Sequence, residues 1–406
     1  TKIFFSLLLS VCYNSLTCVL CHASVVNNSS NNPRPVAYIH PGPGKTGTTH
    51  LQGFLVASEK TLLDNNLAMW PDLYPAFQQC KEDGSLKPTD AMYSNRRDKQ
   101  LKFYSDYYKR CRPMQSVIRQ FIQDSFKLNR NLIFSSESFD TKSILEMLRE
   151  ANYQIHGIIV YRFPLSWFIS RYKETIKTSS ITSKEYKPHT QLSTLTFTEY
   201  ARSKWKHYFG DLHSVDMFFR SLTPYPGHGF SIIDLYGGAA ANKDLKYMVF
   251  CEVMGILCES SIFEEMKTLQ AHDSETDAVV MERQMAFHFV RFAATASQNC
   301  SLDFSKTKGR ARHFLQNRVM NNWKVKIPQR PASNISQYVK QSLEMDTKLR
   351  NKYEQYFIHG NATANALKAK PVPSVMEVDS YVVDSKQEWR REMHDFVLLA
   401  KKMGVC

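Results

Sequence analysis

Short runs of apolar residues alternate with longer amphipathic stretches along the first two thirds of the chain. Four of these runs predict buried strands, at residues 36–39, 131–135, 157–161 and 230–236. Stretches with apolar residues at helical spacing predict helices after residue 50 and at 141–149 and 245–254. Strands that alternate with helices are typical of a parallel sheet covered on both faces. The pattern therefore predicts an α/β fold with a parallel central sheet flanked by helices.

The pattern changes after about residue 310, where the helical stretches become strongly charged. Residues 335–357 and 388–402 predict two helices, and a proline-containing linker at 371–375 separates them. We expect these helices to form a C-terminal extension that packs on the main domain. A solvated helix face explains their lysines without a role in binding.

A glycine- and threonine-rich segment follows the first predicted strand. It reads His40-Pro-Gly-Pro-Gly-Lys-Thr-Gly-Thr-Thr-His-Leu-Gln52 and leads into a predicted helix. Backbone N–H groups of such a turn and the N-terminus of the helix attract an anion. Lys45 adds a full positive charge. The segment therefore predicts a site for a ligand that carries a phosphate group.

This segment differs from the loop that binds ATP or GTP, G-x-x-x-x-G-K-[ST], because the first glycine of that motif would fall at Ile39. It resembles instead the phosphosulfate-binding loop of the sulfotransferases that use PAPS (3′-phosphoadenosine 5′-phosphosulfate), which reads Lys-[Ser/Thr]-Gly-Thr-Thr. The resemblance implies that the 5′-phosphosulfate is bound by Gly44, Lys45, Thr46, Gly47, Thr48 and Thr49.

A second motif begins where the predicted strand 157–161 ends. Arg162 follows this strand, Pro164 suits the first turn of a helix, and Ser170 lies about two turns further on. Sulfotransferases have an arginine and a serine at the same separation, and the resemblance implies that this pair binds the 3′-phosphate of PAPS. An arginine paired with an acidic side chain and a serine bonded to its own helix is the alternative interpretation.

The resemblance covers residues 36–260 and points to the Golgi, carbohydrate-modifying type of sulfotransferase. It implies a P-loop nucleotide-hydrolase-like fold and transfer of a sulfuryl group from PAPS to a hydroxyl by in-line displacement. No metal ion is needed for this reaction. We expect the acceptor hydroxyl to belong to a glycan.

In-line transfer requires a group that neutralises the leaving bisphosphate and a base that takes the hydroxyl proton. Lys45 is the predicted catalytic cation. Glu137 is the predicted base, because it follows the strand 131–135 at the carboxyl edge of the sheet. The substitutes for the base are Asp140, Glu174 and His50. A basic turn at 306–310 could add a cofactor contact, although such turns are common surface features.

Two other functions stay open. A P-loop kinase that acts on a small molecule would need an aspartate for Mg²⁺ after a second strand, and Asp140 and Asp234 are the nearest residues of that kind. A secreted glycan-binding protein with the same fold and no catalysis is the second alternative. The intact Lys45, Arg162 and Ser170 favour an enzyme over that alternative.

The charge balance agrees with an anionic ligand. The formal net charge is +14 and the isoelectric point is about 9.2, which suits an anionic cofactor or an acidic glycan. Nucleic acid would also suit this charge, but the chain has no nucleic-acid motif and no dense block of lysine and arginine. We therefore expect no nucleic-acid partner.

The first residues predict entry into the secretory pathway. Residues 3–20 are mostly apolar behind Lys2, and small residues suitable for cleavage follow them. We expect a Golgi-lumenal type II membrane protein, attached to the membrane through this segment, or a secreted protein. The expected division is residues 1–24 as signal peptide or anchor, 25–35 as linker, 36–315 as sulfotransferase domain and 316–406 as helical extension.

Cysteine usage fits an oxidising compartment. Six cysteines remain after the first segment, namely Cys80, Cys111, Cys251, Cys258, Cys300 and Cys406. Six cysteines allow 15 connectivities, and the local pairs Cys80–Cys111 and Cys251–Cys258 are our predictions. Asparagine sequons occur at residues 27, 28, 299, 334 and 361, as in many lumenal proteins.

Overall fold

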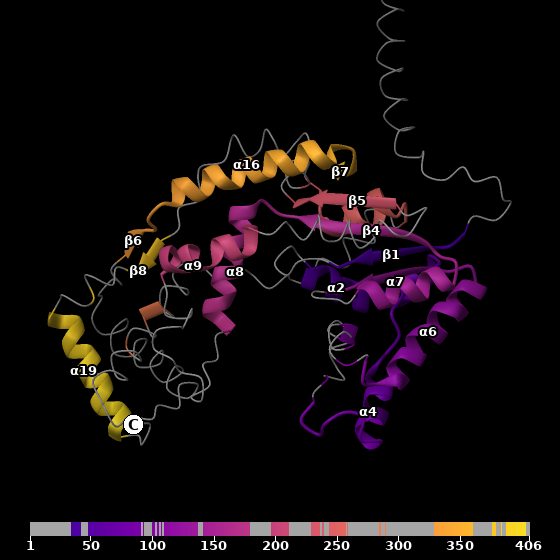
Figure 1. The fold of residues 1–406 in the computed structure, drawn as a ribbon, viewed down its shortest axis with the longest axis horizontal. Coiled ribbons are helices and arrows are strands. Elements are labelled where there is room, and N and C mark those ends of the chain that lie inside the picture. The colour runs from indigo at the N-terminus through magenta and orange to yellow at the C-terminus, as the bar shows by residue number, and fades with distance from the viewer. Residues whose placement is uncertain are drawn as a thin grey trace, which may run out of the picture. The chain divides into compact units, whose positions relative to one another are not determined.

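The computed structural model of the protein is drawn in Figure 1. It describes residues 34–41, 48–90, 92, 100–101, 104, 107, 109–136, 141–178, 196–210, 229–235, 238, 243–256, 258, 284–285, 289, 329–359, 376–378, 383 and 387–402.

A six-stranded parallel sheet flanked by helices forms the centre of the fold, in the order β2-β3-β1-β4-β5-β7. Its strands are β1 (Val36–His40), β2 (Leu67–Met69), β3 (Asn131–Ser135), β4 (Gln154–Tyr161), β5 (Gly229–Asp234) and β7 (Phe357–Ile358). β1 has a partner on each side, since Ile39 pairs with Phe134 of β3 and with Gly157 of β4. The predicted α/β class with a parallel central sheet is therefore confirmed.

The four predicted strands are all present, and three of them differ in their bounds from the prediction. β1 continues by one residue, to His40. β4 begins at Gln154, because the half-buried Gln154 and His156 continue the strand ahead of its apolar run. β5 ends at Asp234, before the residues that were predicted to continue it. The region after residue 316 contributes more than helices, because the short strand β7 pairs in parallel with Ile232 and Ile233 of β5.

Contacts divide the chain into two compact units. The first unit comprises Thr1–Pro41, Leu55–Ile158 and Ser221–Ser231. Its helices are α3 (Glu59–Asp64), α4 (Tyr74–Glu82), α6 (Arg112–Lys127) and α7 (Thr141–Glu150). α6 buries Met114, Ile118 and Ile122, which recur at four-residue spacing and so form one apolar face. In Figure 1, α7 lies next to β1, and α4 lies beside α6.

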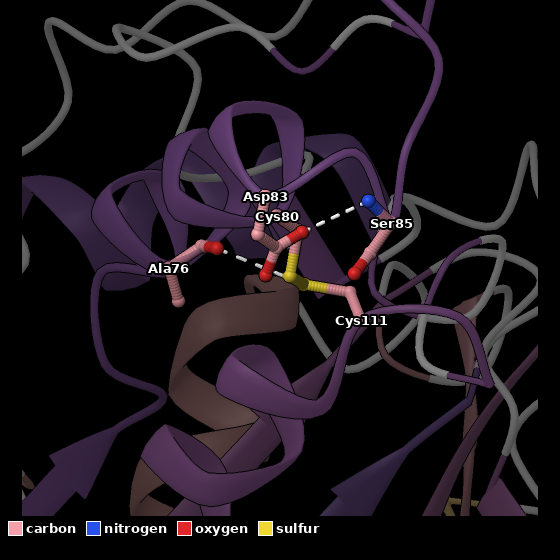
Figure 2. Close-up of a disulfide and its surroundings, with 5 residues drawn as sticks. All are labelled: Ala76, Cys80, Asp83, Ser85 and Cys111. Atoms are coloured by element: carbon pink, nitrogen blue, oxygen red, sulfur yellow. Dashed lines mark hydrogen bonds between the residues drawn. A yellow bond between two sulfur atoms is a disulfide. The ribbon is translucent and has the colours of Figure 1, made fainter.

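A disulfide fastens α4 to the start of α6 within this unit (Figure 2). Cys80 lies in the last turns of α4 and Cys111 directly precedes α6, with 5.7 Å between their Cα atoms. Both cysteines are fully buried. The second predicted pair, Cys251–Cys258, is also bonded. Both predicted local pairings are therefore confirmed.

The second unit comprises Gly42–Phe54, Ile159–Arg220 and Ile232–Cys406. Its helices include the first turns of α2 (Thr48–Ala57), α8 (Pro164–Thr178), α9 (Phe197–Gly210), α12 (Leu245–Tyr247), α16 (Ile335–Tyr353) and α19 (Gln387–Lys402). α12 continues as a π-helical segment, Met248–Val253, and α16 ends in the 3₁₀ turn Glu354–Tyr356. β6 (Gln329–Pro331) and β8 (Met376–Val378) form a small antiparallel pair.

Aromatic rings fill the interface between α8 and α9. Phe168 and Tyr172 of α8 contact Phe197 and Tyr200 of α9, with ring centroids 5.1 to 5.9 Å apart. All four side chains are almost fully buried. This packing fixes the helix that begins just after Arg162.

A buried polar network connects α16 with the carboxyl ends of β4 and β5. The Tyr161 hydroxyl donates to Asp346 Oδ1 at 2.6 Å, and Arg350 Nε donates to Asp346 Oδ2 at 2.9 Å. Arg350 also forms an ion pair with Asp234, the last residue of β5. Burial and the neighbouring Asp346 carboxylate raise the pKa of Tyr161 well above its ordinary value. The network makes α16 an integral part of its unit.

Candidate anion-binding site

The topology of the sheet identifies the edge at which a ligand would bind. The chain order reverses at β1, because β3 and β2 lie on one side of it and β4 and β5 lie on the other. In open α/β sheets, ligands bind outside the carboxyl ends of the strands at such a reversal. The predicted phosphate loop leaves the carboxyl end of β1, and Arg162 leaves that of β4.

The predicted loop residues Gly44, Lys45, Thr46 and Gly47 lie outside the described residues. The chain becomes helical at Thr48, so Thr48 and Thr49 form the beginning of α2. No acidic residue occurs in the first turn of this ten-residue helix. The partial positive charge of the helix N-terminus is therefore not neutralised by the helix itself.

Arg162 lies just after the end of a strand, and Ser170 lies in the helix that follows, as the sequence predicted. Arg162 directly follows β4, and α8 begins two residues later at Pro164, whose fixed φ suits a first helical position. Ser170 lies in the second turn of α8. Both side chains are half-buried. They belong to the same compact unit as the first turns of α2.

The predicted base, Glu137, lies outside the described residues, as does Asp140. The strand that leads to Glu137 is present, and it ends in the buried Ser135 and Ser136. Of the substitutes, Glu174 lies in the third turn of α8 and is half-buried, and His50 lies in the first turn of α2. Partial burial and the neighbouring charge of Lys246 lower the pKa of His50, while Asp244 opposes that effect.

A buried histidine and serine connect the carboxyl ends of β1 and β3 in the first unit. His40 Nδ1 lies 2.8 Å from the Ser135 hydroxyl oxygen, and the Ser136 N–H donates to the His40 carbonyl. His40 is fully buried, and its Nε2 atom has no hydrogen-bond partner in the described part of the chain. Burial lowers the pKa of His40 to about 4. The imidazole is therefore neutral at physiological pH.

Asp234, one of the two aspartates considered for Mg²⁺, has a different role. Its side chain is fully buried, and its carboxylate is paired with the Arg350 guanidinium. A carboxylate used in this way is a poor ligand for a metal ion, because the arginine would have to be displaced first. This arrangement removes one of the two residues on which the kinase alternative rested.

The turn at 306–310, the third possible cofactor contact, lies outside the described residues. Among the described residues, no group of three or more histidine, cysteine or acidic side chains could hold a metal ion. No helix within the described ranges has both the length and the apolar character needed to cross a membrane. The first 33 residues are not among them.

No protein-family model matches the chain, and no curated protein or solved structure is significantly similar to it.

Two residues of functional interest did not emerge from the sequence. His40 was visible only as the first residue of the glycine-rich segment, and its neutrality depends on burial between strands 95 residues apart in the chain. Lys246 was visible only as a polar position in a predicted helix. Its near-complete burial beside α2 comes from tertiary packing.

Proposed function

We propose that the protein is a PAPS-dependent sulfotransferase that transfers a sulfuryl group to a hydroxyl, on a carbohydrate acceptor. The proposal rests on the two motifs and their positions in the sheet. The loop with Lys45 leaves β1, and Arg162 leaves its neighbour β4. Because parallel strands end at the same edge, one ligand with two phosphate groups can reach both motifs.

The described residues fit an anionic donor. The first turn of α2 has no carboxylate that would repel a phosphate group. A guanidinium at a strand end can form a forked, charge-assisted contact with a phosphate, and Arg162 occupies such a position. The Ser170 hydroxyl would add a hydrogen bond from the second turn of α8.

In this proposal, Gly44, Lys45, Thr46, Gly47, Thr48 and Thr49 hold the 5′-phosphosulfate. Arg162 and Ser170 hold the 3′-phosphate. PAPS supplies the sulfuryl group. Glu137 accepts the proton of the acceptor hydroxyl, and Lys45 neutralises the charge that develops on the leaving phosphate. The fold would then be of the P-loop type.

We further propose that the protein works in the lumen of the Golgi or is secreted. Disulfides persist in oxidising compartments and are rare in the cytosol. The two disulfides within the described residues support a lumenal site of folding. The apolar segment at residues 3–20 would provide the entry signal or the membrane anchor.

Ligand-induced thermal stabilisation tests the proposed cofactor. The purified full-length chain is heated with PAP, the bisphosphate product, or with ATP and Mg²⁺. A ligand that binds only the folded state at 100 times its Kd stabilises it by about 2.7 kcal/mol. We expect PAP to raise the melting temperature and Arg162→Ala to abolish the effect. Arg149→Ala, at an exposed site in the last turn of α7, is the matched control and should respond like the wild type.

Stabilisation by ATP with Mg²⁺ alone would contradict the proposal and favour the kinase. Transfer is then tested with radiolabelled PAPS and a panel of glycans. Glu137→Gln should retain the response to PAP and lose about 10²- to 10⁴-fold in transfer rate, as expected for removal of a general base. A protein that binds PAP and glycans but transfers no label would be the catalytically inactive relative.

A further inference from the structure

One asparagine sequon lies in a described part of the fold. Sequons begin at residues 27, 28, 299, 334 and 361, and of these asparagines only Asn334 belongs to the described residues. This sequon reads Asn334-Ile-Ser336 and lies between β6 and α16. An N-linked glycan is bulky and needs a position on the surface of the folded protein. The structure around Asn334 therefore decides whether this sequon is compatible with modification.

The surroundings of Asn334 are open to solvent. Asn334 and Ser336 are exposed, and so are the neighbouring Ser333 and Gln337. The turn is nevertheless held in place, because the Ser333 N–H donates to the Thr198 hydroxyl of α9 at 2.9 Å. A glycan attached to Asn334 would extend into solvent from a fixed turn and would displace no packed side chain.

The side-chain amide of Asn334 has no structural task in the described part of the chain. Asn334 is the N-cap residue of α16, where an asparagine side chain commonly accepts a backbone N–H, but it forms no such bond here. Its carbonyl oxygen instead accepts the N–H groups of Gln337 and Tyr338. No described residue accepts a hydrogen bond from its Nδ2 atom. A sugar on this nitrogen would therefore break no contact.

Two asparagines after α3 use the same atom for structure. Asn65 Nδ2 donates to the Thr61 carbonyl at 2.8 Å, and Asn66 Nδ2 donates to the Asn129 carbonyl at 3.0 Å. A sugar on either nitrogen would crowd these hydrogen bonds. Neither asparagine begins a sequon. The asparagine that does begin one is thus the one whose amide nitrogen is unoccupied.

The backbone supplies a separate reason for an asparagine at this position. Asn334 has a φ of 60°, in the left-handed region that asparagine adopts more readily than most residues. This conformation explains the asparagine, but it does not require a serine two residues later. Ser336 lies in the first turn of α16 with an exposed side chain, and its hydroxyl completes the sequon. The exposed pair is what favours a modification site over a simple turn.

We propose that Asn334 carries an N-linked oligosaccharide. Its Nδ2 atom would form a bond to the anomeric carbon of the first sugar, while the bond from that carbon to a phosphate oxygen breaks. The leaving group is a lipid pyrophosphate, and one Nδ2 proton is released. The lumen of the secretory pathway supplies the donor, a lipid-linked oligosaccharide, and its transferase. The inference therefore rests on the proposed lumenal location, and it does not depend on the proposed sulfotransferase activity.

The test uses the full chain, expressed in a eukaryotic host that performs N-glycosylation. Peptide N-glycosidase in heavy-oxygen water converts each glycosylated asparagine to a mass-labelled aspartate, and mass spectrometry gives the modified fraction at every sequon. Ser336→Ala removes the sequon and leaves Asn334 and its turn in place. Ser336→Thr preserves the sequon. Ser333→Ala alters an exposed serine outside the sequon and is the matched control.

We expect Asn334 to be modified in the wild type, in Ser336→Thr and in Ser333→Ala, and to be unmodified in Ser336→Ala. An endoglycosidase should also remove the glycan from the folded wild type without denaturant, because the turn is exposed. A glycan that is released only after unfolding would contradict the exposed position of this turn.

A wild type that is modified at another sequon but not at Asn334 would overturn the inference and leave the lumenal location intact. Equal labelling of Asn334 in Ser336→Ala and in the wild type would also overturn it, because the label would then not report sequon-dependent glycosylation. A wild type without any modified sequon would overturn the inference as well. Protease digestion of sealed microsomes then tests the location separately, since a digested chain would contradict the lumenal proposal and a protected chain would leave it standing.

Discussion

The buried histidine at the end of β1 gives the sharpest prediction about stability. His40 is fully buried, and burial lowers its pKa from 6.5 to about 4. The folded state therefore binds this proton more weakly than the unfolded state does. Below pH 6.5 the unfolded chain takes up the proton first, so the free energy of unfolding falls as the pH falls.

The size of the effect follows from the two pKa values. Each pKa unit corresponds to about 1.4 kcal/mol, so a decrease from 6.5 to about 4 corresponds to about 3 kcal/mol. The loss should begin near pH 6.5, grow as the pH approaches 4, and stay constant below that value. No contribution from His40 is expected above pH 7.5.

The variant His40→Asn isolates this contribution. An asparagine amide can still bond to the Ser135 hydroxyl, which lies 2.8 Å from His40 Nδ1, and it does not titrate in this range. The free energy of unfolding is measured in urea at pH 7.5 and at pH 4.5. Between these values the wild type should lose about 2 to 3 kcal/mol more than the variant. His207→Asn, at an exposed site in α9, should keep the pH dependence of the wild type.

Equal losses in the wild type and in His40→Asn would refute the reasoning. The His40 imidazole would then be protonated as easily in the folded state as in the unfolded chain. In that case water or an acidic group would have to reach Nε2, and the buried state of this strand end would be wrong.

Two further predictions concern the elements that hold each unit together. Arg350→Met should lower the free energy of unfolding, measured in urea at pH 7, by about 3 to 5 kcal/mol. The reason is that Asp234 and Asp346 would keep buried charges without the arginine that pairs with both. A loss under about 1 kcal/mol would contradict a buried network. Replacing Cys80 and Cys111 by serine should cost about 3 to 4 kcal/mol, the loop-closure value for a sequence separation of 31 residues. Reduction of the wild type should cost at least as much, because the Cys251–Cys258 bond is reduced as well. A midpoint that dithiothreitol does not change would argue against the Cys80–Cys111 bond.

The sequence predicted the elements whose signals are local. The strand at 131–135 has the predicted bounds, and α7 extends one residue beyond the predicted helix 141–149. Both local disulfides follow from cysteines that are near each other in the chain. The periodicity signal acts over about 11 to 18 residues, and the two disulfides join cysteines 7 and 31 positions apart. A single sequence therefore carries this information directly.

The order of the strands in the sheet depends on tertiary contacts. Alternating strands and helices indicated a parallel sheet, but the position of β1 between β3 and β4 is decided by packing. The strand β7 has only two residues and lies in a region with a helical pattern. It forms because Ile232 and Ile233 of β5 offer an unpaired edge, and such a short strand has no periodicity of its own.

The chemistry of the candidate site also depends partly on the sequence and partly on the tertiary structure. The resemblance carried by Lys45, Arg162 and Ser170 implied a donor with two phosphate groups before any fold was known. The states of His40 and Lys246 depend on side chains brought together from distant parts of the chain. Charge and protonation follow from burial, and burial is a property of the folded structure. The sequence determined which groups are available, and the tertiary structure decided which of them are desolvated, because burial depends on contacts between distant parts of the chain.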